Sequence, residues 1–234
     1  MSSDAFEADT APANDVQALI QAGGQGSRLG LGPKAFLVLD GRTLLERAVA
    51  AMRAVASQVT VAVPAADVAR AQRLLGESAQ VIAGGPQRSD TLRALIGAAG
   101  APWLLLHDVV HPFVGAVLSR RVLGEARRSG AAVAGLTNTE FMFGPDGQVK
   151  AAPGELFTMQ KPVACRRVDL LRGLQAQAGA GAARDPSVLQ ILALAGQPVS
   201  FVAGHPANHK LTHEDDWAFV QWLARGAGES EGAP

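Results

Sequence analysis

The sequence predicts one α/β domain built on a mostly parallel, twisted β-sheet with helices on both faces. Short apolar runs of strand length alternate with segments of helical periodicity, and this alternation is typical of parallel sheets covered by helices. The chain has 234 residues, 48% of them hydrophobic, which is enough for one sizeable core. Six runs are predicted to form strands: residues 16–20, 59–63, 81–83, 103–106, 131–136 and 199–202.

Several helix boundaries carry recognisable capping residues. Thr43 stands three residues before Glu46 at the start of an apolar helical pattern, which is the spacing of a capping box. Thr212 and Asp215 repeat this spacing more weakly near the C-terminus. Two glycines follow helical stretches at positions where a left-handed residue commonly ends a helix: Gly130 and Gly196.

The alternation stops at residues 138–162, which are predicted to form a β-arm that projects from the sheet. A glycine, proline and aspartate sequence at residues 144–147 supplies the turn of a hairpin. Residues 1–15 and 226–234 are poor in large apolar side chains, so both are predicted to be flexible, disordered tails. The folded domain is therefore predicted to span residues 16–225.

Composition excludes several classes of function. The chain has 21 lysine and arginine residues in total and 21 aspartate and glutamate residues. It therefore lacks the broad positive field that nucleic-acid binding requires. Cys165 is the single cysteine and cannot form an internal disulfide. The N-terminus has no signal-like apolar core, and His107 and Asp108 interrupt the apolar stretch at residues 103–118. We therefore expect a cytoplasmic protein with no nucleic-acid partner and no membrane segment.

The most informative segment follows the first predicted strand. Three glycines, Gly23, Gly24 and Gly26, stand where the backbone turns at the carboxyl end of that strand. Glycines let backbone N–H groups approach an anion closely. Arg28 and Lys34 add positive charge to the same loop. The segment predicts a binding site for a triphosphate; the alternative is an ordinary glycine-rich turn with two solvated cations.

Two common phosphate-binding motifs do not fit this loop. Leu29 occupies the place of the third glycine in the dinucleotide-binding fingerprint. Lys34 follows Pro33, whereas the Walker motif requires a glycine before its lysine. Both common phosphate-binding motifs are therefore excluded. The histidines and the cysteine have no metal-ligand spacing, so no zinc site is predicted, and His107 is interpreted as a packed or hydrogen-bonded residue.

The loop from Ala22 to Lys34 resembles the signature loop of the nucleotidyltransferases that make activated sugars and polyols. More specifically, the chain resembles the 2-C-methyl-D-erythritol 4-phosphate cytidylyltransferase family from about residue 16 to about residue 223. Further matching motifs follow in order: Gly84, Gly85, Arg88 and Thr91; His107, Asp108 and Pro112; Thr137 and Thr139; and Asn208, Lys210 and Thr212.

The resemblance implies a Rossmann-like nucleotidyltransferase fold and the transfer of CMP from CTP to a small polyol phosphate, with release of pyrophosphate, in isoprenoid biosynthesis. It also implies Mg²⁺ as the cofactor, held by Asp108, and a homodimer whose arms cross to the partner. The implied catalytic residues are Arg28, Lys34 and Lys210. The implied nucleotide-binding residues are Ala22, Gly23, Gly24, Gly26, Gly85, Arg88 and Thr91. The implied acceptor-binding residues are Asp108, His111, Thr137 and Thr158.

The acceptor side departs from the family pattern. His111 and Thr158 stand where the family usually has arginines that grip the acceptor phosphate, and Lys161 stands where a threonine is usual. A neutral histidine or threonine cannot reproduce the bidentate fork of an arginine. Lys161, Arg166 and Arg184 are candidates for a rebuilt phosphate site.

Three alternatives remain open on the sequence. The acceptor could be ribitol phosphate or a phosphonate instead of 2-C-methyl-D-erythritol 4-phosphate. The nucleotide could be GTP or UTP, although Thr91 keeps the hydroxyl group that reads the cytosine ring in the family. The chain could also be an inactive relative that binds a nucleotide without catalysis, which the retained charged residues of the site disfavour.

Overall fold

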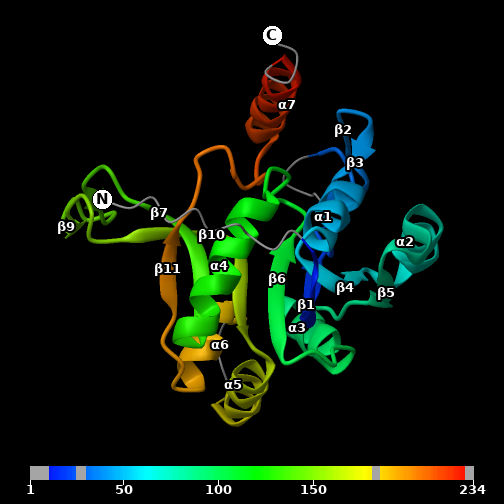
Figure 1. The fold of residues 1–234 in the computed structure, drawn as a ribbon. Helices are drawn as coiled ribbons and strands as arrows, with labels where there is room; N and C mark the ends of the chain where they lie inside the picture. Colours follow the sequence, from blue (N-terminus) through cyan, green and yellow to red (C-terminus); the bar gives the residue numbers. More distant parts are fainter. Residues whose placement is uncertain (1–10, 25–29, 181–184, 230–234) are drawn as a thin grey trace, which may run out of the picture.

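The computed structural model describes residues 11–24, 30–180 and 185–229, and the predicted α/β fold is confirmed (Figure 1). Within these residues a seven-stranded sheet forms the centre of the molecule. Its strands are β1 (Ala13–Gln21), β4 (Ala56–Val63), β5 (Gln80–Ala83), β6 (Trp103–Asp108), β7 (Ala131–Thr137), β10 (Phe157–Arg166) and β11 (Ser200–Ala203). They follow the order β11-β7-β10-β6-β1-β4-β5 across the sheet.

Strand β10 is the one strand of this sheet that the sequence pattern did not predict. It runs antiparallel to both its neighbours, β6 and β7, whereas the other strand pairs are parallel. Gln160, Lys161 and Pro162 interrupt its apolar alternation, so its strand character depends on neighbours that are distant in the sequence. Residues 157–162 therefore belong to the main sheet, and the arm ends earlier than predicted.

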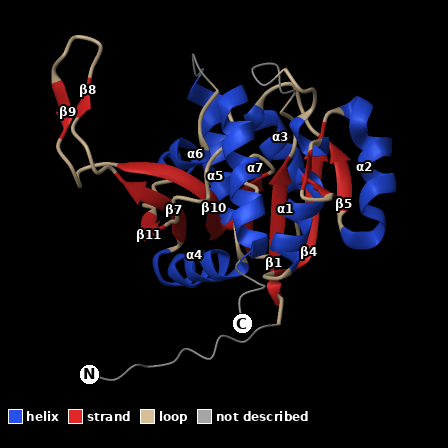
Figure 2. Cartoon of the chain, turned by 90° about the horizontal axis from the view of Figure 1, so that it is seen from above, coloured by secondary structure: helices blue, strands red, loops and turns tan. Residues whose placement is uncertain are grey.

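Helices cover both faces of the sheet, as predicted (Figures 1 and 2). One face packs against α1 (Leu44–Arg53), α2 (Val68–Leu75) and α4 (Ala116–Ser129). The other face packs against α3 (Arg88–Gly97), α5 (Arg167–Ala180) and α6 (Val188–Leu194). Helix α7 (Glu214–Glu229) packs near the small hairpin of β2 (Val38–Leu39) and β3 (Arg42–Thr43). The described residues also form short 3₁₀ helices: η1 (Lys34–Phe36), η2 (Ala65–Asp67) and η3 (Gly76–Ser78).

The central strands are apolar on both sides because both faces are covered. Successive residues of a strand point to opposite faces, so Ala18 and Ile20 join the core beneath α1 and α4, and Leu19 joins the core beneath α3 and α5. All three side chains are fully buried. These two cores fix the register of β1 against its neighbours, and with it the place where the glycine-rich loop begins.

The predicted capping devices are confirmed at α1 and corrected at α7. Glu46 N–H donates to Thr43 Oγ1 at 3.1 Å, and Thr43 N–H donates to a carboxylate oxygen of Glu46 at 2.8 Å. At α7 the acceptor is Asp216, not Asp215: it receives the N–H groups of Thr212 and His213 at 2.6 and 2.7 Å. Two glycines adopt the predicted positive φ after helices: Gly130 and Gly196.

The arm is a hairpin of β8 (Met142–Phe143) and β9 (Val149–Ala151) that projects beyond the end of β7 (Figure 2). Gly144 N–H donates to the carbonyl oxygen of Gln148 at 2.8 Å, which closes the predicted turn. Asn138 ties the base of the arm together, because its side chain accepts from Leu156 N–H and donates to the carbonyl oxygen of Ala152, both at 2.8 Å. The arm is thus defined at its base, but a hairpin of this size builds no hydrophobic core of its own.

Both ends of the domain extend further than predicted. Strand β1 begins inside the expected N-terminal tail: Ala13 pairs with Ala56, and Asp15 forms an ion pair of 2.6 Å with Arg127. Helix α7 continues beyond the expected domain end at residue 225. The remainder of the two expected tails, residues 1–10 and 230–234, lies outside the described residues.

Candidate active site

A cavity of about 560 Å³ lies at the carboxyl edge of the parallel strands. Gln21 at the end of β1 pairs with Asp108 at the end of β6, and both residues line the cavity. From β1 the chain first builds the sheet in one direction, through β4 and β5, and then returns to β6 on the other side of β1. A strand order that reverses in this way leaves a crevice at the carboxyl ends, where open α/β sheets bind ligands.

The first wall of the cavity is the start of the glycine-rich loop. Ala22 is buried, and its N–H donates to the carbonyl oxygen of Ala62 at 2.8 Å, which continues the sheet by one residue. Gly23 and Gly24 follow and line the cavity with exposed backbone. Gly26 and Arg28, which the sequence places in the same loop, lie outside the described residues.

Lys34 enters the cavity from the far end of this loop. Its side chain is buried, and its ammonium group donates to the carbonyl oxygens of Leu211 and Thr212 at 2.9 and 3.2 Å. Its own N–H donates to the carbonyl oxygen of Gly24 at 3.2 Å. Lys34 therefore joins the glycine loop to a segment almost at the other end of the chain.

The second wall is the turn from β5 into α3. A side chain at Gly85 would meet the Cβ atom of Asp90 at 2.4 Å, so only glycine fits there. The Thr91 hydroxyl accepts from Gly85 N–H at 3.1 Å and lies 3.1 Å from the carbonyl oxygen of Gln87. Thr91 therefore shapes the turn and also lines the cavity, together with an adjoining hollow of about 300 Å³.

Arg88 stands at the first turn of α3 with a side chain that is 71% exposed. Asp185 faces this turn and accepts the N–H groups of Arg88 and Ser89 at 3.0 and 3.2 Å. A carboxylate at a helix N-terminus satisfies free N–H groups and interacts well with the helix dipole. Asp185 thus fixes the end of α3 that forms the cavity wall, a role that the sequence did not reveal.

The third wall is the segment that precedes α7 and carries Lys210. Asn208 anchors one end, since its side chain donates to the carbonyl oxygen of Lys161 at 2.6 Å. Asp216 anchors the other end through Thr212 and His213, and its second oxygen lies 2.9 Å from His209 Nε2. Lys210, between the two anchors, is exposed and lines the cavity.

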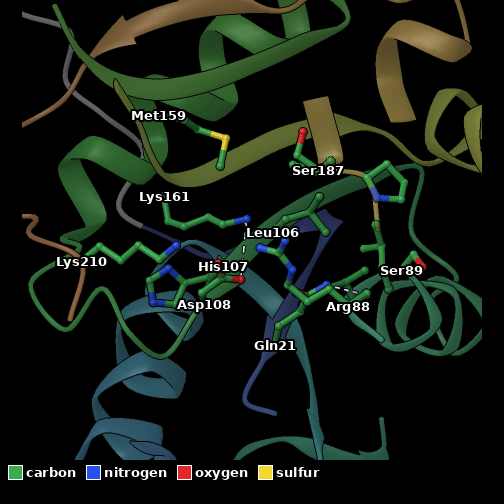
Figure 3. A pocket seen from close by; sticks show the side chains of 14 residues that line it. Gln21, Arg88, Ser89, Leu106, His107, Asp108, Met159, Lys161, Ser187 and Lys210 are labelled. Atoms are coloured by element: carbon green, nitrogen blue, oxygen red, sulfur yellow. Dashed lines mark hydrogen bonds and ion pairs between the residues drawn. The ribbon is translucent and has the colours of Figure 1, made fainter. Parts of the chain in front are cut away.

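Asp108 and Lys161 face each other across β6 and β10 (Figure 3). Because Val163 pairs with Leu106 in antiparallel register, Asp108, two residues after Leu106, lies opposite Lys161, two residues before Val163, at the edge of the sheet. Lys161 Nζ lies 3.6 Å from Asp108 Oδ1, and both residues line a smaller pocket of about 70 Å³ beside the main cavity. Figure 3 shows Lys210 extending toward the same carboxylate from a different element.

The two histidines near Asp108 are buried and differ in their surroundings. Burial lowers the pKa of His107 well below its ordinary value, and neither ring nitrogen has a hydrogen-bond partner in the described part of the chain. Burial also lowers the pKa of His111 to about 4, against the opposing effect of Asp108. His111 Nδ1 lies 3.3 Å from the carbonyl oxygen of Asn208. His111 therefore supports the Lys210 segment in a neutral form and does not line either pocket.

The other residues predicted on the acceptor side lie away from these pockets. Thr137 and Thr158 are exposed on β7 and β10 and line neither pocket. Arg166 is at the opposite end of β10, where it pairs with Asp169 at 2.7 Å. Arg184 lies outside the described residues. Of the candidates for a rebuilt phosphate site, the described structure brings only Lys161 to the pocket.

This arrangement can do one kind of chemistry well. The glycine loop and the buried Lys34 line the larger cavity, Asp108 and Lys210 line both the cavity and the smaller pocket, and Lys161 lines the smaller pocket. Fixed positive groups of this kind stabilise negative charge that develops on phosphate oxygens. The fold and the site are those of a nucleotidyltransferase.

Comparisons with known proteins identify the family. The family described as 2-C-methyl-D-erythritol 4-phosphate cytidylyltransferase matches residues 16–225. The enzyme of that name from Thermus thermophilus is 39% identical over 216 residues, 90% of this chain and 98% of the relative. The Deinococcus radiodurans enzyme is 37% identical over 210 residues, 88% of each chain. The Thermus crystal structure matches with a TM-score of 0.76 and 35% identity, over 90% of this chain and 98% of that one. The chain belongs to the 2-C-methyl-D-erythritol 4-phosphate cytidylyltransferase family.

Proposed function

We propose that the protein transfers CMP from CTP to 2-C-methyl-D-erythritol 4-phosphate and releases pyrophosphate, the reaction named for its relatives. The observation that carries this proposal is the cavity at the switch point of the sheet, where Lys34, Asp108 and Lys210 meet the glycine loop and the turn at Gly85. Each wall comes from a different part of the chain, and all face one space.

In the proposed reaction, a phosphate oxygen of the acceptor forms a bond to the α-phosphorus of CTP. The bond between that phosphorus and the oxygen bridging to the β-phosphate breaks, and pyrophosphate leaves with the bonding electrons. No covalent bond to the protein is needed, so the protein acts by positioning and by charge. Lys34 and the glycine loop would hold the triphosphate, and Lys210, which lines both the cavity and the smaller pocket, would act where the two substrates meet.

Asp108 fits the Mg²⁺ that the family resemblance implies. Its Oδ1 atom accepts no hydrogen bond within the described chain. Mg²⁺ is commonly held by one or two carboxylates together with substrate phosphates, so no larger cluster is required. Asp108 would hold the ion, which when bound would offset charge on the triphosphate. The described residues contain no group of three His, Cys, Asp or Glu side chains arranged for a metal.

The choice of CTP rests on the turn at Gly85. The Thr91 hydroxyl accepts from Gly85 N–H and donates to a backbone carbonyl, so it has one acceptor position left. An amino group on the base can donate a hydrogen bond to that free acceptor position of the Thr91 hydroxyl, whereas a carbonyl group on the base has no hydrogen to donate. This favours cytosine, whose exocyclic nitrogen donates, over uracil.

We also propose that the protein is a cytoplasmic homodimer whose arms contact the partner. The arm exposes large apolar side chains on a short hairpin, including Met142 (46%), Phe143 (63%) and Val149 (54%). Exposed apolar patches of this kind are typical of protein interfaces. In the described part of the chain no helix is long and apolar enough to cross a membrane.

Pyrophosphate release tests the proposed function directly. Purified protein is incubated with Mg²⁺, each of the four nucleoside triphosphates, and one of three acceptors: 2-C-methyl-D-erythritol 4-phosphate, ribitol 5-phosphate or a small phosphonate. We expect rapid release only with CTP and the methylerythritol phosphate. Release with ribitol 5-phosphate alone would assign a different acceptor, and no release in any combination would contradict the proposed enzymatic function.

A further inference from the structure

Gln160 on β10 is a buried polar side chain whose amide group is hydrogen-bonded to a single loop. Its exposed fraction is 4%. Its Nε2 atom donates to the carbonyl oxygens of His205 and Asn208, both at 3.0 Å. Its Oε1 atom accepts from His205 N–H at 3.2 Å. A side-chain amide has two donor hydrogens and one acceptor oxygen, so Gln160 uses all of them on the segment between β11 and Lys210.

The loop is shaped to receive this amide. Gly204 directly follows β11, and its N–H donates to the carbonyl oxygen of Gly135 at 2.7 Å, which continues the pairing of β11 with β7. A Cβ atom at Gly204 would lie 2.1 Å from Gln160 Oε1. Any side chain at this position would therefore push the amide away from the loop, so Gly204 and Gln160 are matched to each other.

Gln160 lies where β10 departs from regular pairing. The register of β10 against β7 shifts between Met159 and Val163, and Gln160 is within that interval. Irregularities of this kind re-aim side chains and are common beside active sites. The irregular stretch of β10 thus supplies the side chain that holds a segment from a different part of the chain.

The segment that Gln160 holds leads directly to Lys210. Asn208 is fixed from both sides, because its carbonyl oxygen accepts from Gln160 and its side chain donates to the carbonyl oxygen of Lys161 at 2.6 Å. Lys210 follows two residues later, is exposed, and lines both the larger cavity and the smaller pocket. The position of its backbone therefore decides where its ammonium group can reach.

We propose that Gln160 is a positioning residue for Lys210 and acts on the reaction rate through the loop between β11 and α7. The inference rests on the proposed function and deepens it. Gln160 lines neither the cavity nor the smaller pocket, so it is not placed to touch a substrate. Charge that develops during phosphoryl transfer is stabilised best by a cation that is already fixed in place, and the three hydrogen bonds of Gln160 fix the segment that carries Lys210.

Steady-state kinetics of the full chain test this role. Gln160→Met keeps the approximate length of the side chain and removes all three hydrogen bonds. We expect kcat with CTP and 2-C-methyl-D-erythritol 4-phosphate to fall about 10-fold or more. KM for CTP should change less than about threefold, because Lys34, the glycine loop and the turn at Gly85 keep their own contacts.

Gln197 provides a matched control, since it is also a buried glutamine with three hydrogen bonds. Its Nε2 atom donates to the carbonyl oxygens of Ser129 and Pro198 at 3.0 and 2.6 Å, and its Oε1 atom accepts from Arg166 at 2.9 Å. It lines neither pocket. Gln197→Met should lower the melting temperature about as much as Gln160→Met does, but leave kcat within about twofold of wild type.

A second variant keeps the test valid if Gln160→Met does not fold. Gln160→Glu retains an oxygen for His205 N–H, but its ionised carboxylate cannot donate to either carbonyl oxygen. Protonation restores one donor, and burial favours the protonated form. The kcat of this variant relative to wild type should therefore be low at about pH 8 and recover toward about pH 6.

Combination with Lys210→Met separates positioning from general stability. In that background Gln160→Met should lower kcat by less than about twofold, because the group being positioned is already absent.

Three results would overturn the proposal: a folded Gln160→Met variant with normal kcat, equal kcat losses in the Gln160 and Gln197 variants, or additive losses with Lys210→Met. These outcomes leave the proposed function intact as long as the wild type releases pyrophosphate from CTP. A wild type that releases none with any acceptor would refute the proposed function and, with it, this role.

Discussion

The ammonium group of Lys34 donates a 2.9 Å hydrogen bond to the carbonyl oxygen of Leu211, a residue 177 positions further along the chain. A second bond of 3.2 Å reaches the carbonyl oxygen of Thr212. Both acceptors directly follow Lys210, so the lysine of the glycine loop holds the segment that carries the other lysine of the cavity. Two walls of the cavity are therefore joined by one side chain.

Removing the Lys34 charge should affect catalysis and stability together. Lys34→Met keeps the buried stem but leaves two carbonyl oxygens without their donor and removes a positive group beside the proposed triphosphate site. We expect kcat/KM to fall at least about 100-fold and the melting temperature to fall by several degrees. Pyrophosphate release and thermal denaturation measure the two effects.

Arg53→Met provides the control for Lys34. Arg53 also donates to a backbone carbonyl, that of Ser78 at 2.9 Å, but it lies outside the cavity. Its loss should leave kcat/KM within about twofold of wild type. Equal kinetic losses in the two variants would show that the Lys34 effect is general destabilisation.

Asp216 should act on turnover through the position of Lys210. Asp216→Asn weakens the bonds from Thr212 and His213, so Lys210 is held less firmly. We expect kcat to fall about 10-fold with little change in the overall fold. In a Lys210→Met background the same substitution should have almost no further effect, because the group being positioned is already absent.

Asp215→Asn is the neighbouring control, since Asp215 is exposed and is not the capping residue. It should leave kcat unchanged. Additive losses from Asp216→Asn and Lys210→Met would argue against a positioning role and in favour of a general structural one.

His111 should make stability depend on pH. Its folded pKa is lowered to about 4 by burial, so the unfolded chain takes up a proton near the ordinary value of 6.5 and the folded protein does not. The free energy of unfolding should therefore be highest above pH 6.5 and fall, by up to about 3 kcal/mol, as pH decreases to 4. Urea denaturation between pH 7.5 and 4.5 measures this slope.

His111→Gln should flatten part of that slope, and the remaining part would come from buried His107, whose pKa is also lowered by burial. His213→Gln, a change at an exposed histidine, should leave the slope as it is. A slope that is identical in the His111 variant and the wild type would contradict the buried, neutral state of His111.

The arm should be needed for dimerisation. Phe143→Ser removes the most exposed aromatic side chain of the hairpin and should convert the protein to a monomer at micromolar concentration. Val117→Ser changes an apolar residue on α4 that is more exposed than Phe143, at 73% against 63%, and should leave the oligomeric state unchanged. Light scattering distinguishes the two states; a monomeric wild type would refute the proposed homodimer.

Local sequence patterns were sufficient to predict the parallel strands, the capping of α1 and the start of the glycine-rich loop. Apolar periodicity, the pair Thr43 and Glu46, and the glycines at 23 and 24 act over a few residues, so their effect can be predicted locally. The cap of α7 was misassigned by one residue, because the geometry of the turn after Thr212 determines which carboxylate reaches the free N–H groups.

The smaller pocket beside Asp108, in contrast, is built by contacts between distant parts of the chain. The place of β10 between β6 and β7 depends on pairing with strands distant in the sequence, and that pairing sets Lys161 opposite Asp108. The same packing buries His111 against Asn208 and leaves Arg166 at the far end of the strand. Spacing along the chain does not encode these relationships, because they arise from register and burial that only the assembled sheet imposes.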